Sequence, residues 1–383
     1  MSDPSSSVAV NLPILQDIYR DILAKSAPHN SLQNVCPLAF SGRNSLNAFW
    51  QVVSDVPEAT IVRANPSRID LDLYKKGTLS VCHTQGSFGQ RILDRSARSI
   101  KKLTVENAPI WARNWLKEFV NHDRLKELII DRQVESGSFT ILAQIARSIK
   151  KLTDKTGKVV PKLKGGDFDY VAIKMTNFSW PENLLSSNMK FTTKYFHCVV
   201  DEPGVTHTLV TLQREFSKVS SEKLAAVKTF HIFFNFFRAQ RNFQPFVDTI
   251  AEKMPNVETI VLSLETIEPG LDRAYKFLPH NIGKTYEAIQ NLVPPLGVTV
   301  KTKVISNTKT YVYNDDLELP NRIVTVLGCM RRVPLNENVK VATSTRALEN
   351  ERNRYQQWEF DAGNEMGPHK EFSCDITIYA EKF

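Results

Sequence analysis

The sequence lacks the features that mark secreted, membrane-spanning and disulfide-stabilised proteins. None of its 383 residues belongs to a run of about 18 apolar residues, the length that a membrane-spanning helix needs. The Ser-rich first ten residues have neither the basic stretch nor the apolar core of a signal peptide. Five scattered cysteines form no Cys-x-x-Cys pair. We therefore expect reduced, mostly buried thiols in a cytoplasmic or nuclear protein that does not bind membranes.

Local catalytic motifs are also missing. The chain has no Gly-x-Ser-x-Gly, no Gly-x-x-x-x-Gly-Lys, no His-Glu-x-x-His and no Gly-x-Gly-x-x-Gly. Because triads assemble in space, this absence lowers the odds of an enzyme without excluding one. The pairs Cys82-His83 and His197-Cys198 have no partner at the spacing of a metal site, so core positions are expected for them. We predict a non-enzymatic protein without a cofactor.

Basic residues are concentrated in one part of the chain. The net charge is +8, and residues 61–170 carry 21 Lys/Arg against 12 Asp/Glu, a local net charge of +9. Residues 1–60 have a net charge of −2, from three basic and five acidic residues. A basic face can bind nucleic acid, a membrane surface or an acidic protein, or it can simply be solvated.

An eight-residue phrase occurs twice within this basic region. Ala-Arg-Ser-Ile-Lys-Lys-Leu-Thr stands at 97–104 and again at 146–153, an offset of 49 residues. Two units of 24 to 25 residues give that offset, which lies in the range of leucine-rich repeats, roughly 20–29 residues. A third unit is expected midway, and Leu125-Lys-Glu-Leu128-Ile-Ile130 has the required spacing of apolar residues.

The repeated spacing predicts strands at 100–105, 125–130 and 149–153, each with one apolar face. Helices are expected before them, at Phe88–Ser99, Trp111–Arg124 and Phe139–Ser148. Thr60–Arg63 and Leu79–Cys82 are predicted as the first two strands. Helix and strand alternating at a fixed period indicate a stacked α/β solenoid. An ordinary α/β domain is the alternative, although the midway unit and the absence of a Gly-rich strand-to-helix turn speak against it.

Residues 11–53 are predicted to form three short helices. Asn11 and Pro13 suit a helix start, and Leu15, Ile18, Tyr19, Ile22 and Leu23 follow with helical periodicity. A second helix is expected after Ser31, and a third between Ser45 and Val53. Because about 43 residues make a small core, this unit should dock on the repeats or on a partner.

The order Leu12-Pro13, Ile22-Leu23, Leu32, Val35, Ser41-x-Arg43 and Trp50 resembles an F-box, in the divergent style common in nematodes. Followed by leucine-rich repeats, it is similar to the substrate receptors of cullin–RING (SCF-type) ubiquitin ligases. Two positions depart from the pattern: Ile14 and Leu15 stand where a Glu is usual, and Phe40-Ser41-Gly-Arg43 replaces the usual Val-x-Arg. The resemblance implies binding to a Skp-type adaptor, and through it to a cullin, by Leu12, Pro13, Ile18, Ile22, Leu32, Val35 and Trp50. A helical cap on the repeats is the alternative for this unit.

The repeats are expected to extend over 54–270, with an irregular α/β continuation or cap over 271–383. Predicted strands here are Tyr170–Met175, Val227–Ile232, Val257–Leu262, Val298–Ile305, Arg322–Leu327 and Asp375–Tyr379. Runs at 191–200 and 206–213 suggest paired strands. Helices are expected at Phe243–Lys253 and at Thr345–Trp358. Most of the phenylalanines between Phe230 and Phe237 should be core.

Two functions follow from these patterns. The first is a ubiquitin-ligase adaptor that selects an acidic protein target through Lys101, Lys102, Lys126, Lys150 and Lys151, beside the repeat strands. The second is a basic repeat protein that binds nucleic acid through the same lysines, with the N-terminal helices as a cap. Against the second, none of these five lysines has an aromatic residue next to it in the sequence.

Overall fold

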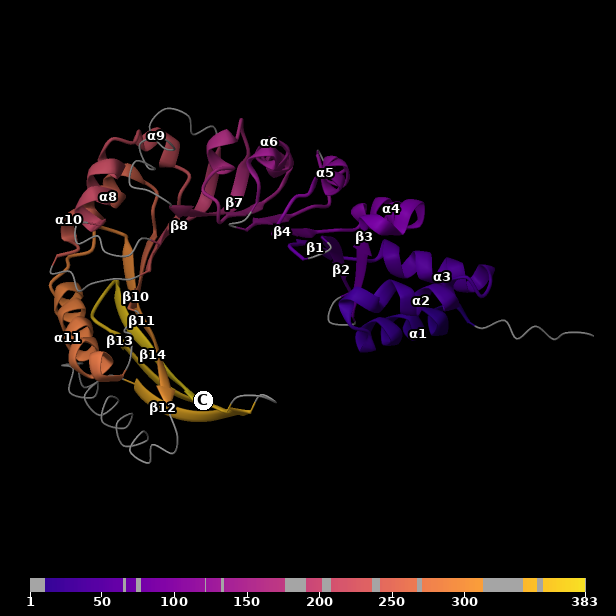
Figure 1. The fold of residues 1–383 in the computed structure, drawn as a ribbon. Coiled ribbons are helices and arrows are strands. Elements are labelled where there is room, and N and C mark those ends of the chain that lie inside the picture. The colour runs from indigo at the N-terminus through magenta and orange to yellow at the C-terminus, as the bar shows by residue number, and fades with distance from the viewer. Residues whose placement is uncertain are drawn as a thin grey trace, which may run out of the picture. The chain divides into compact units, whose positions relative to one another are not determined.

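The computed structural model describes residues 11–64, 67–73, 77–120, 122–131, 134–175, 191–201, 208–235, 242–266, 271–312, 340–349 and 354–382. Contacts divide the chain into two compact units, residues 1–171 and 172–383. Both are α/β units with a mostly parallel sheet, and the first begins with a cluster of helices (Figure 1). Within the described ranges, no helix is long and apolar enough to cross a membrane.

Three helices open the first unit, as the sequence predicts: α1 (Leu12–Lys25), α2 (Ser31–Ala39) and α3 (Arg43–Ser54). They pack around Tyr19 and Phe49, both fully buried with ring centroids 5.6 Å apart. The buried hydroxyl group of Tyr19 forms a hydrogen bond with Ser45 Oγ at 2.7 Å. Pro13 lies in the first turn of α1, but Asn11 makes no side-chain capping bond. Hydrophobic burial of one stripe therefore holds α1 in place.

The sheet of the first unit follows these helices. Its strands are β1 (Glu58–Val62), β2 (Arg68–Asp72), β3 (Thr78–Cys82), β4 (Lys102–Val105), β5 (Glu127–Ile130), β6 (Lys151–Asp154) and the beginning of β7 (Asp167–Met175). They lie in the order β3-β2-β1-β4-β5-β6-β7. The pairs β1–β4, β4–β5 and β5–β6 are parallel. The pairs β1–β2 and β2–β3 are antiparallel. Ser31 ties the helical cluster to this sheet, because the backbone N–H of Ser80 donates to its hydroxyl at 2.8 Å.

The three predicted repeat strands are confirmed as β4, β5 and β6. Leu103, Leu128 and Leu152 pair across neighbouring strands and are fully buried. Their separations are 25 and 24 residues, the unit length expected from the repeated phrase. The predicted helices are present in shortened form as α4 (Gly86–Ala97), α5 (Ile110–Lys117) and α6 (Phe139–Ile145). They cover one face of the sheet (Figure 1), where alternate strand residues are buried.

The second unit repeats the same layering. It contains β8 (Thr192–Asp201), α8 (Thr208–Ser217), α9 (Ser221–Leu224), β9 (Thr229–Asn235), α10 (Gln244–Lys253), β10 (Thr259–Thr266), α11 (Leu271–Gln290), β11 (Thr299–Val312), β12 (Lys340–Glu349), β13 (Arg354–Glu365) and β14 (Lys370–Lys382). The order is β8-β9-β10-β11-β14-β13-β12. The pairs β8–β9, β9–β10, β10–β11 and β11–β14 are parallel. The pairs β12–β13 and β13–β14 are antiparallel.

Two secondary-structure predictions for this unit are wrong. The segment predicted as a strand at 206–213 begins α8, because Leu209, Leu212 and Phe216 recur with helical spacing and are buried together. The helix predicted at Thr345–Trp358 is instead parts of β12 and β13, which pair antiparallel in register. The mixed charges of this segment are compatible with a helix or a strand, and the pairing of β12 with β13 makes it a strand. The predicted strand Arg322–Leu327 lies outside the described residues. Phe230 and Phe234 are core, as expected.

Candidate functional site

Helix α1 carries a second apolar strip beside the one that it buries. Leu15, Tyr19 and Leu23 face the helical core with exposures of 7% or less. Ile14 and Ile18, one turn apart, remain 54% and 39% exposed, and Ile22 continues the line as a half-buried residue. We call Ile14, Ile18 and Ile22 the outer strip. Among the described residues, the fold leaves Ile14 and Ile18 the least covered of the three.

The residues predicted to bind an adaptor fall into two groups. Pro13 and Ile18 are exposed, and Leu12, Ile22 and Trp50 are half-buried, so all five reach the surface of the helical cluster. Leu32 and Val35, in contrast, are 5% and 0% exposed and belong to the core of the cluster. Their apolar character serves the packing of α2 against its neighbours. The predicted adaptor-binding residues that reach the surface therefore lie on α1 and α3.

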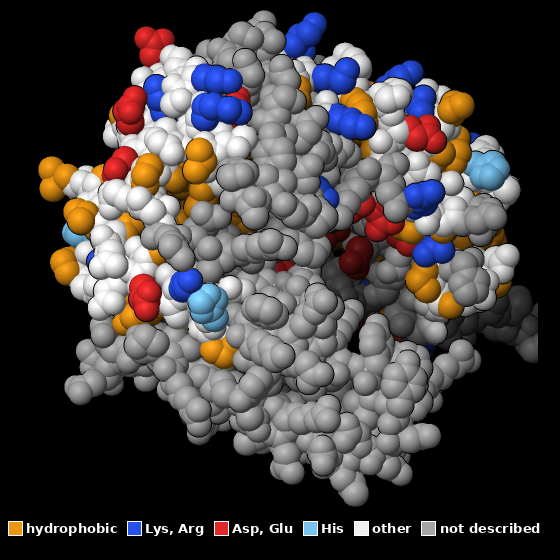
Figure 2. Space-filling view, turned by 60° about the vertical axis from the view of Figure 1, so that its left-hand side comes forward, with side chains coloured by type: hydrophobic (Ala, Val, Ile, Leu, Met, Phe, Trp, Pro, Cys, Tyr) orange, Lys and Arg blue, Asp and Glu red, His pale blue; other side chains and the backbone are white. Residues whose placement is uncertain are grey.

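Other exposed hydrophobic residues are more isolated. Those described with large exposure are Phe40 and Ile110 in the first unit and Val210, Val293 and Leu296 in the second. On the face of the molecule in Figure 2, hydrophobic, basic and acidic side chains are interspersed, as is normal for a protein surface. Among the described residues, only Ile14 and Ile18 combine large exposure with neighbouring positions on one helix.

A row of basic residues lies where the repeat strands begin. The backbone N–H of Lys126 donates to Lys101 O at 2.7 Å, and that of Lys150 donates to Lys126 O at 3.0 Å. Three of the predicted target-binding lysines are thus neighbours, each one residue before a strand: β4, β5 or β6. Arg98, Arg124 and Arg147 precede them by two or three residues, and all six side chains are exposed. We call these six residues the basic edge.

The other two predicted lysines, Lys102 and Lys151, lie in a different row. Glu58 pairs with Lys102 across β1 and β4, Lys102 with Glu127, and Glu127 with Lys151. Acidic and basic residues therefore alternate along this row, and Lys102 Nζ lies 3.0 Å from Glu58 Oε2. The hydrogen bond to Glu58 raises the pKa of Lys102 against the opposing effect of burial. Opposite charges offset each other here, so we exclude this row from the basic edge.

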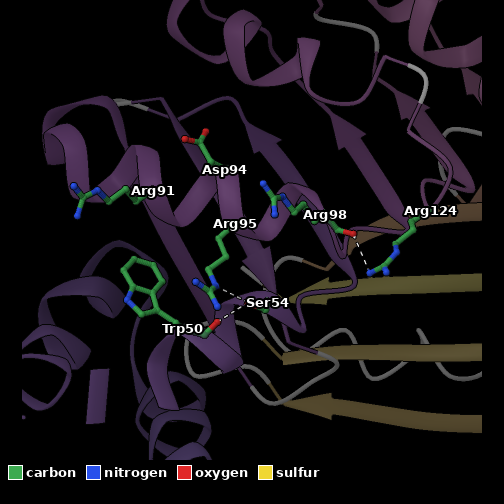
Figure 3. A pocket seen from close by; sticks show the side chains of 7 residues that line it. All are labelled: Trp50, Ser54, Arg91, Asp94, Arg95, Arg98 and Arg124. Carbon is green, nitrogen blue, oxygen red and sulfur yellow. Dashed lines mark hydrogen bonds between the residues drawn. The ribbon is translucent and has the colours of Figure 1, made fainter. Parts of the chain in front are cut away.

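An arginine-lined pocket adjoins the first end of the basic edge. Figure 3 shows Arg91, Asp94 and Arg95 projecting from one face of α4, with Arg98 just after the helix and Arg124 shortly before β5. Trp50 and Ser54 from α3 complete the lining of a hollow of about 590 Å³. Except for the half-buried Trp50 and Ser54, these side chains are exposed. Four guanidinium groups and a single carboxylate thus surround one concave site. We call it the arginine pocket.

Two of the four guanidinium groups are fixed by the fold. Arg95 Nε donates to Ser54 Oγ at 2.7 Å, and its guanidinium lies over the Trp50 ring, 5.7 Å from the centroid. Ser54 Oγ in turn donates to Trp50 O at 2.7 Å. Arg124 Nη1 donates to Arg98 O at 3.3 Å. These contacts fix the positions of the Arg95 and Arg124 side chains at the hollow, and a guanidinium group held in place loses less conformational freedom when it binds an anion.

The sequence signal for this pocket was present but not interpretable alone. Arg91, Arg95 and Arg98 recur at intervals of four and three residues, which places them on one helical face. Trp50, which the sequence predicts to bind an adaptor, lies under the Arg95 guanidinium in the structure. Its ring also packs near that of Phe88, with the two ring centroids 5.6 Å apart.

A scan against protein-family models and a search of curated proteins give no match to this chain.

Proposed function

We propose that this protein is an adaptor that brings an acidic protein target to a ubiquitin ligase of the SCF type. The N-terminal helices dock on a Skp-type adaptor, and through it on a cullin. The first unit's basic edge holds the target. The protein acts by proximity and carries out no bond chemistry itself. It needs no cofactor for this role.

The outer strip of α1 is the observation that carries the proposal. A helix that is apolar on its packed side needs no exposed isoleucines one turn apart, and their exposure has a cost in water unless a partner covers them. Helices that present such anchors to a groove form a common mode of recognition. The F-box resemblance assigns that groove to a Skp-type adaptor. Leu12 and Pro13, at the start of the same helix, extend the surface, and Trp50 lies beside it on α3.

The architecture that we propose for the repeats is a leucine-rich-repeat-like solenoid. Support comes from the constant unit length and from the in-register pairing of Leu103, Leu128 and Leu152. A stack of this kind places equivalent residues of successive units side by side, which turns single lysines into a row. An acidic segment lying along that row would meet three lysines and three arginines, of which Lys150 is paired with Asp167 at 3.3 Å. The alternating row of Glu58, Lys102, Glu127 and Lys151 would not attract it.

Adaptor binding is tested by placing charge on the outer strip. We expect wild-type protein to form a stable complex with a Skp-type adaptor in size-exclusion chromatography, and Ile14→Asp/Ile18→Asp to weaken binding at least tenfold. Two buried isoleucines contribute about 1.5–3 kcal/mol each, and a buried unpaired carboxylate adds a penalty. Gln33→Asp/Asn34→Asp is the matched control, because it adds the same two negative charges on exposed α2 surface. The absence of a wild-type complex at micromolar concentration would refute this part of the proposal.

Target binding is tested on the two lysine rows. We expect Lys101→Gln/Lys126→Gln/Lys150→Gln to weaken binding of an octaglutamate peptide at least tenfold at 50 mM salt, because each lysine lies on the basic edge. Lys102→Gln/Lys151→Gln removes lysines from the alternating row, so it should change the affinity less than twofold. Fluorescence anisotropy measures both. If a single-stranded oligothymidylate binds more tightly than the peptide, with a steep dependence on salt, the nucleic-acid function replaces the proposed one.

A further inference from the structure

The arginine pocket has a charge balance that the fold does not compensate. Three basic side chains elsewhere in the first unit sit beside carboxylates: Lys102, Arg113 and Lys155 each lie within 3.1 Å of one. Within the described residues, none of the four pocket arginines forms an ion pair. Asp94, the carboxylate in the lining, accepts a hydrogen bond from the Gln90 amide at 2.6 Å. Four cations therefore face a hollow that contains one carboxylate.

The pocket also supplies donors that are not used internally. Arg95 and Arg124 are oriented by Ser54 and by the carbonyl of Arg98, respectively. The guanidinium groups of Arg91 and Arg98 make no hydrogen bond to any described residue. A bound anion would satisfy these donors and would relieve the repulsion among the four cations. Both effects favour a ligand that carries more than one negative charge.

A phosphate ester fits these requirements better than a carboxylate does. At neutral pH a phosphomonoester carries a charge of about −1.5 to −2 and three acceptor oxygens. Arginine forks bind such groups through paired N–H···O bonds, and several arginines can bind different oxygens of one phosphate. The volume of about 590 Å³ also leaves room for the organic group that carries the phosphate. The half-buried ring of Trp50 provides an apolar wall for it.

We propose that the arginine pocket is a binding site for a phosphomonoester. Arg98 and Arg124 supply positive charge to this site from the side of the repeats, and Arg91 and Arg95 supply it from α4. The site stands independently of adaptor binding, because the outer strip contributes no residue to it. The phosphate can come from a phosphorylated side chain of a protein or from a free mononucleotide, and the shared chemistry is the same.

The chain offers a matched pair for the test. Arg98 and Arg147 occupy the same position in the two copies of the repeated eight-residue phrase, and both are exposed. Only Arg98 lines the pocket. Arg98→Gln/Arg124→Gln therefore removes two pocket cations, while Arg147→Gln removes a cation from an equivalent place outside. Circular dichroism and melting temperature should match wild type for all variants, since these side chains are exposed.

Isothermal titration calorimetry with the full chain decides the proposal. The probes are a short acidic phosphoserine peptide, the same peptide with serine or glutamate in its place, and adenosine 5′-monophosphate. We expect at least one phosphate probe to bind ten times more tightly than its unphosphorylated counterpart, which is the serine peptide or adenosine. Arg98→Gln/Arg124→Gln should reduce this affinity at least ten times more than Arg147→Gln does, because all three arginines lie on the basic edge and only Arg98 and Arg124 line the pocket. Asp94→Asn should raise the affinity. The tighter of the two phosphate probes identifies the source.

Equal binding of the phosphoserine, glutamate and serine peptides, with no preference for the mononucleotide over adenosine, would overturn the proposal. So would an equal loss in Arg147→Gln and in the pocket variant, because it would mean a diffuse charge effect rather than a site. Neither outcome bears on the adaptor complex, which is measured separately with the outer-strip variant. A failed pocket and a failed adaptor interface are therefore distinguishable.

Discussion

Replacing Asp154 by asparagine is expected to lower the free energy of unfolding of the first unit by about 3–5 kcal/mol. The Asp154 carboxylate is fully buried at the end of β6. Its Oδ1 accepts hydrogen bonds from Thr156 N, Thr156 Oγ1 and Gly157 N at 2.6–3.1 Å. Its Oδ2 accepts from Val159 N and Val160 N at 2.8 and 2.9 Å. One side chain thus organises the whole turn that follows the strand.

Asparagine has nearly the same shape but one acceptor oxygen fewer. Whichever way its amide turns, an NH₂ group must face backbone N–H donors, which leaves two or more buried donors without a partner. Urea unfolding followed by tryptophan fluorescence measures the loss. Asp167→Asn is the control, because the Asp167 carboxylate is exposed and lies 3.3 Å from Lys150 Nζ, so this change should cost less than 1 kcal/mol. A loss below 1 kcal/mol for Asp154→Asn would contradict the assigned role.

Acidification from pH 6.5 to pH 4.5 is expected to destabilise the second unit by about 2–4 kcal/mol through one histidine pair. His197 and His231 are directly opposite on β8 and β9, with ring centroids 4.1 Å apart and ring planes 3° from parallel. Burial lowers the pKa of both to about 4, and the neighbouring His197 lowers that of His231 further. His231 also hydrogen-bonds to Tyr195 at 3.0 Å and to Ser263 at 2.8 Å.

The sign of this pH effect follows from the protons bound in each state. Below pH 6.5 the unfolded chain protonates its histidines, whereas the folded pair stays neutral until about pH 4. Unfolding therefore takes up protons in this window, and stability falls as the pH falls. The facing groups do not reverse this: Tyr195 and Ser263 are neutral throughout the range, and the buried Cys198 has its pKa raised.

Urea unfolding followed by circular dichroism at pH 7.0, 6.0, 5.0 and 4.5 measures the loss. His197→Phe keeps a flat ring in the stack and removes one titrating group, so about half of the loss should disappear. His280→Gln, an exposed histidine of the same unit, should leave the pH dependence unchanged. An unaltered pH profile in His197→Phe would show that other groups cause the acid sensitivity.

The local elements of the first unit were predictable because their signals are short in sequence. The repeat spacing located β4, β5 and β6, and one apolar stripe located α1. The third repeat seemed to lose its final apolar residue, since Asp154 stands where Val105 and Ile130 stand in the others. The sequence offered no reason for this. The structure supplies one, because the carboxylate binds the backbone of the next turn.

The arginine pocket was not predictable, because its residues are far apart in the chain. Trp50 on α3 and Arg124 before β5 converge only when α3 packs against α4. Leu32 and Val35 show the opposite difficulty: an apolar residue that matches a binding motif cannot be distinguished from a core residue until its burial is known. The sequence also could not show which lysines share a row. Only the strand register places Lys101 on the basic edge and Lys102 in the alternating row.

The alternating row of Glu58, Lys102, Glu127 and Lys151 restricts how this array can grow or shrink. Removing one unit, the 25 residues 103–127, would bring Lys102 beside Lys151, and like charges on neighbouring strands destabilise a sheet. Removing or copying two units preserves the alternation. The repeated eight-residue phrase recurs after 49 residues, which is two units rather than one. The pair of units is therefore the smallest segment that can be duplicated here without a clash of charges.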